Sequence, residues 1–594
     1  MSRWVARSAA VVVATLVCCQ GCGEPRRVER QLNRSPLSLI SSKSSTDNTR
    51  AVEPGFRDFA ELTAGIAPER RVLLPREDDT GPRTETFFFP EHENNNNASR
   101  ATDVSLPALL HGHMDPLIDV PAGDEDWYSF LVERDRPGVM DIELTGVTKL
   151  DLSIEVFYDA FRGRTRLVKI NNQGRGQGER LPNFSLPNGR YYVRVSQEVS
   201  KERPARYDVV HPYEVKLTPK ELSATEETEP NDAALSAVPL HLGEQMTGLV
   251  NRDQDEDWYS LDLLKVSAFS LLAVELLPPM ETTLELAIST QTRQELLVVT
   301  AAKGKRLYLP NLAILEGSSG YLFRVRATEA GQPKDPYRLE VHNEPLAERV
   351  ELEPDDSAKT ALRLYWEEPL SGWLSHPDDV DWFHLEPNDD WGMGDGGKPS
   401  KPALNLVLGG VPGINLILEM YDSDQESLLA RYDVRGKGEG EEAPNLAVPV
   451  RTLYIKVSAS EGDNAGAQYV LQARAVTTDD MEVEPNNTPE QPTVIETVGS
   501  QVMGYLSPRG DRDCFRFVQP QLSLLFKPAP QGTTTVSAYD ALGALYFQRR
   551  SEEEPMRIPA TAGPLTLCLE LAGDVAESPR TPYILIPHDM LPSE

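Results

Sequence analysis

The chain has 594 residues, of which 92 are acidic and 59 basic, so its formal net charge is −33. Its hydrophobic content of 40% is sufficient for ordinary cores and excludes a wholly disordered chain, and this length is typical of about four domains. The negative charge argues against a nucleic-acid-binding protein, because phosphates would be repelled, and makes divalent cations the natural partner.

The first 22 residues have the pattern of an export signal. Two arginines precede an apolar run at 9–17 that is too short to span a bilayer. Residues 16–23, Leu-Val-Cys-Cys-Gln-Gly-Cys-Gly, resemble the lipobox of bacterial lipoproteins, which implies lipidation of Cys22, with Cys19 as the alternative. We therefore expect an exported protein that an N-terminal lipid anchors in the outer membrane or at the cell surface. An ordinary cleaved secretory signal is the other interpretation.

Residues 23–84 are rich in Arg, Ser, Thr, Pro and Glu and show little periodicity, which indicates a disordered tether. Beyond it, the same order of short alternating strands returns four times, with Gly, Pro and Asn turns between them. Such a pattern is typical of two-sheet sandwiches. We therefore predict an all-β fold, a tandem array of four jelly-roll-like β-sandwich domains at 85–216, 225–342, 350–473 and 481–590, called repeats one to four below.

One acidic pattern recurs in all four repeats. Glu-x-Glu and a following pair of Asn or Asp residues are answered later in the repeat by Asp-x-Asp. The interval between copies is one whole domain, not a solenoid unit of 20 to 50 residues. The candidate metal ligands are, in chain order, Glu91, Glu93, Asn95, Asn96, Asp124 and Asp126; Glu227, Glu229, Asn231, Asp232, Asp255 and Asp257; Glu351, Glu353, Asp355, Asp356, Asp379 and Asp381; and Glu482, Glu484, Asn486, Asn487, Asp511 and Asp513.

These residue types and their spacing favour a hard cation. In an extended segment Glu-x-Glu places both carboxylates on one side, and the Asn/Asp pair can turn further oxygens to the same point. Two such charges about 4 Å apart repel by roughly 4 kcal/mol at an effective dielectric near 20, a cost that a cation removes. Calcium accepts six to eight oxygens in flexible geometry, whereas zinc would require His or Cys. The alternative interpretation is a set of solvated turns.

Several motifs together resemble a known family. Glu-Pro-Asn-Asp at 229–232, Asp-x-Asp-Trp-Tyr at 255–259, the Tyr-Asp turn at 421–422 and the closing Tyr-x-Val strand at 213–215 resemble the bacterial pre-peptidase C-terminal domain. That family is a β-sandwich also represented by the collagen-binding modules of clostridial collagenases. The resemblance covers roughly residues 85–590 and implies up to one calcium ion per repeat, bound by the acidic pattern. Repeat one departs from it, with Asn94 in place of the proline.

Two further features concern the sheet faces. Strand alternation makes the aromatic residue after each Asp-x-Asp-x a core residue and places Trp127, Trp258 and Trp382 on the outer face. Cys514 and Cys568, the cysteines outside the N-terminal segment, also face outward. A disulfide between them would suit an oxidising compartment, but whether their strands are neighbours stays open.

The sequence carries no catalytic motif that we recognise: it has no His-Glu-x-x-His, no Gly-x-Ser-x-Gly and no glycine-rich phosphate loop. Paired carboxylates can hydrolyse glycosides, but here they recur in every repeat at positions better suited to a metal. We therefore expect no catalytic residues, and a calcium-stabilised envelope protein that binds or displays polysaccharide or another envelope protein. A structural spacer and an accessory subunit of a secreted hydrolase or protease system are the alternatives.

Overall fold

The computed structural model describes residues 70–72 and 86–587, apart from gaps of which the longest are 117–122, 200–203, 251–254, 330–334, 388–401 and 573–580. The predicted signal, Cys19 and Cys22, and most of the predicted tether lie outside the described residues. The structure differs from a wholly disordered tether at β1 (Arg70–Val72), which pairs antiparallel with β2 (Thr86–Pro90). No helix among the described residues is long and apolar enough to cross a membrane.

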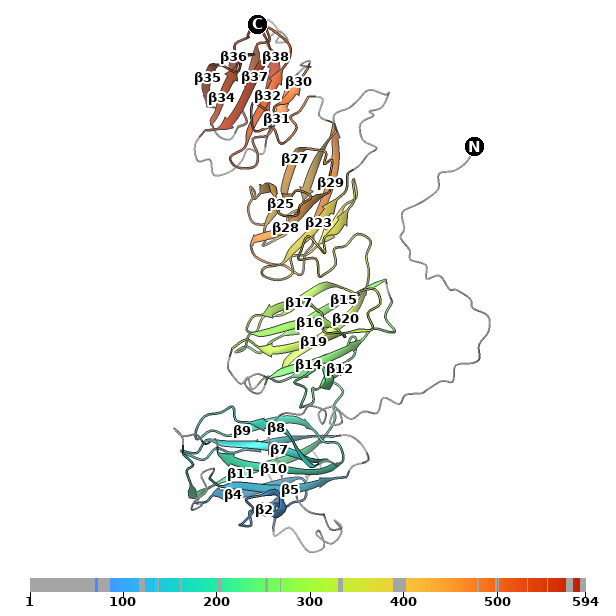
Figure 1. The fold of residues 1–594 in the computed structure, drawn as a ribbon, viewed down its shortest axis with the longest axis vertical. Helices are drawn as coiled ribbons and strands as arrows, with labels where there is room; N and C mark the ends of the chain where they lie inside the picture. Colours follow the sequence, from blue (N-terminus) through green and yellow to red (C-terminus); the bar gives the residue numbers. More distant parts are fainter. Residues whose placement is uncertain are drawn as a thin grey trace, which may run out of the picture. The chain divides into compact units, whose positions relative to one another are not determined.

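The described residues are all-β, which confirms the expected class. They form strands and two short 3-10 helices, η2 (Ala98–Arg100) and η3 (Ala234–Ser236). The strands make eight sheets, two in each repeat (Figure 1). One sheet of each pair has five strands, and the other has four, except in repeat one, where β1 and β2 extend it to six.

The five-stranded sheets have the same strand order in every repeat. In repeat one the order is β3 (Thr102–Asp103), β5 (Glu125–Val132), β10 (Gly189–Gln197), β7 (Leu152–Ala160), β8 (Gly163–Ile170). In repeat two it is β12 (Val238–Leu240), β14 (Glu256–Asp262), β19 (Gly320–Ala327), β16 (Leu284–Thr290), β17 (Glu295–Ala301). In repeat three it is β21 (Leu362–Leu364), β23 (Val380–Leu385), β28 (Leu453–Glu461), β25 (Asn415–Tyr421), β26 (Leu428–Tyr432). In repeat four it is β30 (Thr493–Ile495), β32 (Arg512–Phe517), β37 (Leu565–Leu571), β34 (Thr533–Tyr539), β35 (Leu545–Glu552).

The second sheets also share one order, in which the closing strand of the repeat is central. In repeat one β1 and β2 are followed by β4 (Ala108–Met114), β11 (Asp208–Glu221), β6 (Gly138–Leu144), β9 (Glu179–Ser185). In repeat two the order is β13 (Met246–Gly248), β20 (Tyr337–Pro345), β15 (Ser270–Leu277), β18 (Leu307–Ala313). In repeat three it is β22 (Leu370–Gly372), β29 (Tyr469–Thr477), β24 (Pro402–Leu408), β27 (Glu441–Ala447). In repeat four it is β31 (Val502–Gly504), β38 (Tyr583–Pro587), β33 (Leu524–Lys527), β36 (Met556–Ile558).

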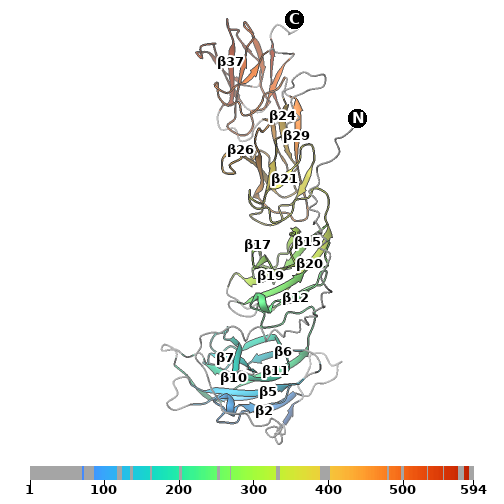
Figure 2. The same cartoon turned by 45° about the vertical axis from the view of Figure 1, so that its right-hand side comes forward.

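Each pair of sheets encloses a hydrophobic cluster of its own. Because successive side chains of a strand point to opposite faces, one face of each sheet supplies the cluster. In repeat two Tyr259 and Phe323, on neighbouring strands β14 and β19, lie in one cluster with Leu339 of β20. Strands β15 and β20 of the second sheet lie side by side in both views (Figures 1 and 2). The aromatic residues after Asp-x-Asp-x, Tyr128 and Tyr259 among them, are buried as predicted.

The outer faces of the five-stranded sheets carry the tryptophans and the cysteines. Trp127 packs against Ala98 of η2 and against Tyr192, so a short helix covers it. Cys514 on β32 is directly opposite Cys568 on β37, and the two are joined by a disulfide with a Cα–Cα distance of 4.1 Å. The strand adjacency that the sequence leaves open is therefore present.

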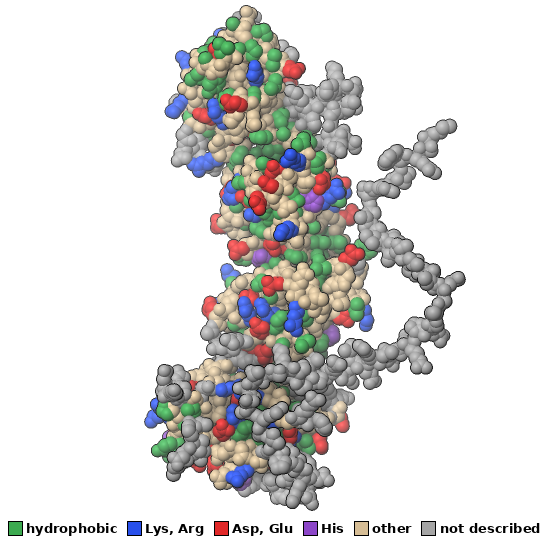
Figure 3. Space-filling view, viewed as in Figure 1, with side chains coloured by type: hydrophobic (Ala, Val, Ile, Leu, Met, Phe, Trp, Pro, Cys, Tyr) green, Lys and Arg blue, Asp and Glu red, His purple; other side chains and the backbone are tan. Residues whose placement is uncertain are grey.

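Surface charge is mixed on the face drawn in Figure 3, where acidic and basic side chains are interspersed. Some form ion pairs across a sheet, such as Arg324 with Glu285 and Arg431 with Glu419. Most carboxylates of the recurrent acidic pattern, in contrast, are buried. Part of the acidic excess of the chain therefore lies inside the repeats and not on their surface.

Candidate metal centres

Every repeat brings the two halves of its acidic pattern together. In each, carboxylates from the start of the repeat and from the Asp-x-Asp strand offer ligand atoms that all lie within 4.8 Å of one another. The four groups are Glu91, Glu93 and Asp126; Glu229, Asp255 and Asp257; Glu351, Glu353, Asp355 and Asp381; and Glu482, Glu484 and Asp513. They are buried, except that Glu93 is exposed and Glu91 is half-buried in repeat one.

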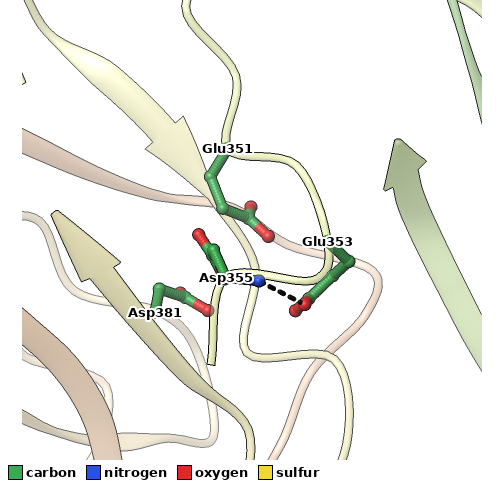
Figure 4. Close-up of side chains that lie close together, drawn as sticks. All are labelled: Glu351, Glu353, Asp355 and Asp381. Atoms are coloured by element: carbon green, nitrogen blue, oxygen red, sulfur yellow. Dashed lines mark hydrogen bonds between the residues drawn. The ribbon is translucent and has the colours of Figure 1, made fainter. Parts of the chain in front are cut away.

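Repeat three holds the fullest group, in which Glu351, Glu353, Asp355 and Asp381 point toward one another (Figure 4). The first three lie in the segment between β20 and β21, and Asp381 lies on β23. These three stand at every second position of a segment that is not a regular strand and has a cis bond between Glu353 and Pro354. All four residues expose at most 1% of their surface.

Hydrogen bonds hold the carboxylates of repeat three in place. The backbone N–H of Trp373 donates to Glu351 (3.1 Å), and the N–H of Asp355 donates to Glu353 (3.1 Å; Figure 4). The hydroxyl of Tyr469, on closing strand β29, donates to Asp381 Oδ2. For Glu353 and Asp381 the bond occupies one carboxylate oxygen and leaves the other without a donor, whereas the second oxygen of Glu351 accepts from Nδ2 of Asn311.

The remaining oxygens lack donors. Buried atoms with no hydrogen-bond partner among the described residues include both carboxylate oxygens of Asp355, Asp381 Oδ1 and Glu353 Oε1. The other repeats show the same pattern at Asp126 Oδ1, Asp257 Oδ1, Asn231 Oδ1, Glu484 Oε1 and Asp513 Oδ1. Leaving such an atom unsatisfied costs about 1–3 kcal/mol, more for a charged group. Several buried oxygens without donors at one place fit the ligand set of a hard cation.

Burial and mutual repulsion raise the pKa values of these carboxyl groups. Burial raises the pKa of Glu353 to about 10, and the charges of Asp355 and Asp379 add to the shift. In repeat one burial raises the pKa of Asp126 to about 9, and in repeat four it raises that of Glu482 to about 8. The ionised groups are therefore costly without a counter-charge, which a cation supplies.

A glycine and a tyrosine that sequence reasoning missed complete each site. The closing-strand hydroxyl of Tyr213 donates to Asp126 (2.6 Å) and that of Tyr337 donates to Asp257 (2.7 Å), whereas Tyr583 donates to Glu482 (2.9 Å). A Cβ on the facing glycine would lie 2.1–2.3 Å from the tyrosine oxygen in every repeat, at Gly112, Gly248, Gly372 and Gly504. The signal available in the sequence is the recurrence of this glycine 21 or 22 residues after the first Glu.

The N–H that follows the glycine binds the first glutamate of the pattern. His113, Leu249 and Tyr505 donate to Glu91, Glu227 and Glu482 at 2.8, 2.5 and 2.6 Å. Glu227 is buried and also accepts a hydrogen bond from the Tyr259 hydroxyl (3.2 Å). It therefore adjoins the group of repeat two although it is not one of the three mutually close carboxylates there.

The remaining predicted ligands divide into two sets. The first member of each Asn/Asp pair is fully buried, at Asn95, Asn231, Asp355 and Asn486. The second member lies farther out: Asp232 and Asn487 are exposed, and Asn96 and Asp356 are half-buried. Asp232 and Asp356 are not among the mutually close carboxylates of their repeats.

The first aspartate of Asp-x-Asp holds a loop in three repeats. Asp124, Asp379 and Asp511 accept hydrogen bonds from the backbone N–H of Asp115 (2.5 Å), Ser375 (2.5 Å) and Ser507 (2.8 Å). Only Asp255 belongs to one of the mutually close groups. In repeats three and four these bonds fix the loop that precedes the Asp-x-Asp strand, whereas in repeat one residues 117–122 of that loop lie outside the described part of the chain.

No protein-family model and no curated protein matches the chain. Solved structures give weak likenesses. "The Triple Jelly Roll Fold and Turret Assembly in an Archaeal Virus" is 11% identical, covers 60% of this chain and 88% of that chain, and has a TM-score of 0.17. The CBM22-1–CBM22-2 tandem domain of Paenibacillus barcinonensis Xyn10C is 9% identical, with coverages of 36% and 82% and a TM-score of 0.12. The M60 catalytic domain with CBM51-1 and CBM51-2 of Clostridium perfringens ZmpB is 8% identical, with coverages of 76% and 54% and a TM-score of 0.13. At these TM-scores the likenesses carry no argument about this chain.

Proposed function

We propose that the chain is a tandem array of four jelly-roll-like β-sandwich domains of the pre-peptidase C-terminal type, each stabilised by one calcium ion. The observation that carries the proposal is the recurrence, in every repeat, of buried carboxylate oxygens that converge and lack hydrogen-bond donors. Oxygen-only groups of this kind suit calcium, which accepts six to eight oxygens at irregular angles, better than zinc.

The four sites are not equivalent. Repeat three offers four mutually close carboxylates, and repeats two and four offer three. In repeat one Glu93 is exposed, and exposure lets water and salt screen its charge. We therefore expect repeat three to bind calcium most tightly and repeat one most weakly.

The proposal of separate sandwiches rests on the extent of the sheets, because only isolated bridges among the described residues, such as Leu312 with Glu353, join one repeat to the next. The eight sheets have no strand in common, and each repeat has its own hydrophobic cluster. The alternative is a continuous β-solenoid, in which neighbouring repeats would share one core. Calorimetric melting of residues 225–342, produced without the rest of the chain, distinguishes the two architectures. A separate sandwich folds and melts cooperatively by itself, whereas a segment of a solenoid does not.

At the cell envelope, such an array would act as a non-enzymatic, lipid-anchored module that binds or displays polysaccharide or another envelope protein. Calcium would stabilise it by binding the folded arrangement and not the unfolded chain. Isothermal titration of the exported chain with calcium, paired with calorimetric melting, tests the metal part. We expect up to four bound ions and a higher melting temperature. No bound ion together with an unchanged melting curve refutes the proposal.

A further inference from the structure

A Pro-Asn pair interrupts the last strand of the second sheet in the first three repeats. It lies at Pro182-Asn183 in β9, Pro310-Asn311 in β18 and Pro444-Asn445 in β27, and the strand pairing shifts register at each. After the pair, each strand continues for two more residues, which still pair with the neighbouring strand.

Those strand ends bind the segment that carries the next repeat's acidic pattern. The N–H of Glu353 donates to the carbonyl of Asn311 (3.1 Å), and the N–H of Ala313 donates to the carbonyl of Glu353 (2.8 Å). The same two bonds join Glu229 to Asn183 and Ser185 (3.0 and 2.7 Å), and Glu484 to Asn445 and Ala447 (2.8 and 2.6 Å). In all three cases the glutamate is the second of Glu-x-Glu, a member of a candidate metal group.

A side chain strengthens this connection in one of the three cases. Asn311 is buried, and its Nδ2 donates to Oε1 of Glu351, the first glutamate of repeat three. Asn445 is completely buried, and neither polar atom of its side chain has a partner among the described residues. Asn183 differs, because its Oδ1 accepts a hydrogen bond from Lys220 (2.9 Å).

Repeat four supplies an internal comparison. Its strand β36 pairs Ile558 with Leu524 and stops there, and the residues that follow are Pro559 and Ala560. Repeat four thus lacks the asparagine and the two extra paired residues.

Backbone conformation alone does not explain the asparagines. Asn183 and Asn445 have positive φ, at 50° and 53°, a region that asparagine tolerates better than most residues. Asn311, however, is not among the residues with positive φ, yet it is an asparagine as well. What Asn311 shares with the other two is the pair of backbone bonds to the next glutamate.

We infer that each Pro-Asn strand end is a docking element for the following acidic linker, so that an ion bound in repeat two, three or four also fixes that linker to the repeat before it. The inference rests on the proposed calcium sites. Asn311 acts as a positioning residue: it holds one oxygen of Glu351 while the N–H of Trp373 holds the other. A cation that orders Glu351 and Glu353 then orders the segment between the two repeats.

Limited trypsin digestion of the full exported chain tests this, because Arg349 is exposed and lies just before Glu351. Mass spectrometry follows cleavage of the 349–350 bond, and titration calorimetry counts bound calcium in the same samples. We expect calcium to slow this cleavage. In calcium, Asn311→Ala should be cleaved roughly tenfold faster than the wild type, which corresponds to the loss of one hydrogen bond to a charged group. Ala560→Asn is the matched control and leaves cleavage unchanged.

The outcomes separate the two proposals. If Asn311→Ala binds calcium and is protected like the wild type, the docking inference is wrong and the calcium sites stand. If the wild type binds no calcium, the proposed function itself fails. Should Asn311→Ala not fold, Asn311→Leu provides the same test, because leucine keeps the branched shape of the side chain but has no N–H to donate to Glu351; unchanged protection of the 349–350 bond in that variant overturns the inference.

Discussion

Substituting Asp381 by asparagine should have opposite effects with and without calcium. The amide keeps an oxygen that can accept the Tyr469 hydroxyl, but it removes one negative charge from a group of four buried carboxylates. When a chelator removes calcium, the loss of this charge relieves repulsion among the carboxylates, which amounts to roughly 4 kcal/mol for a fully ionised pair about 4 Å apart. The raised pKa of Glu353 shows that protonation already relieves part of this repulsion. We therefore expect a net stabilisation of about 1–2 kcal/mol, a fraction of that pair energy.

With calcium in excess, the same substitution removes a ligand. A hundredfold loss of affinity would remove about 2.7 kcal/mol of ligand-derived stability. For a domain of this size, 1 kcal/mol shifts the melting temperature by about 4 °C. Scanning calorimetry of the full chain should therefore show the melting of repeat three rise by several degrees in chelator and fall by more in calcium.

The control for this experiment is Glu426→Gln, an exposed acid of the same repeat that changes the net charge equally. It should change the melting of repeat three little in either condition. If Asp381→Asn lowers the melting temperature equally with and without calcium, Asp381 is only a hydrogen-bond acceptor for Tyr469, and the reasoning about the cation is refuted.

Three further predictions concern pH, the glycine and the disulfide. With calcium removed by a chelator, the melting temperature should fall as the pH rises from 6 to 9. The reason is that burial raises the folded-state pKa of a carboxyl such as Asp126 to about 9, so its contribution to stability is fully present below the unfolded-state pKa and is lost as the pH rises through the folded-state pKa. Calcium should flatten this trend, and a melting temperature that rises with pH in chelator would contradict it. Gly372→Ala should destabilise repeat three by about 2 kcal/mol or more and weaken its calcium binding, because the new Cβ would lie 2.3 Å from the Tyr469 hydroxyl; unchanged melting would contradict this packing. Replacing Cys514 and Cys568 by alanine should lower the stability of repeat four by about 2–4 kcal/mol and leave the calcium count unchanged; a lost ion would show that the disulfide shapes the site.

The sequence was sufficient to predict the all-β class and the convergence of the acids. Glu351, Glu353 and Asp355 stand at every second position, and this spacing of acids is visible in a short stretch of chain. The spacing does not separate Asp355, which belongs to the close group, from Asp356, which is half-buried and does not.

Long-range contacts are what the sequence could not supply. The Tyr469 hydroxyl reaches Asp381 across 88 positions, and the space for it exists because residue 372 has no side chain. Whether Cys514 and Cys568 could bond depended on strand order, which spacing does not reveal. The pairing of Arg70–Val72 with β2 was hidden for the same reason, because polar, aperiodic residues gained a sheet edge that lies farther along the chain.

The most direct test of the account is a crystal structure of the protein grown with calcium, with anomalous scattering used to locate the ions. We expect an anomalous peak in repeat three within 2.3–2.6 Å of oxygens of Glu353, Asp355 and Asp381, the usual calcium–oxygen distance. Carboxylates that remain in contact with one another with no peak among them, in crystals soaked at high calcium, would contradict the claim that these groups are cation sites.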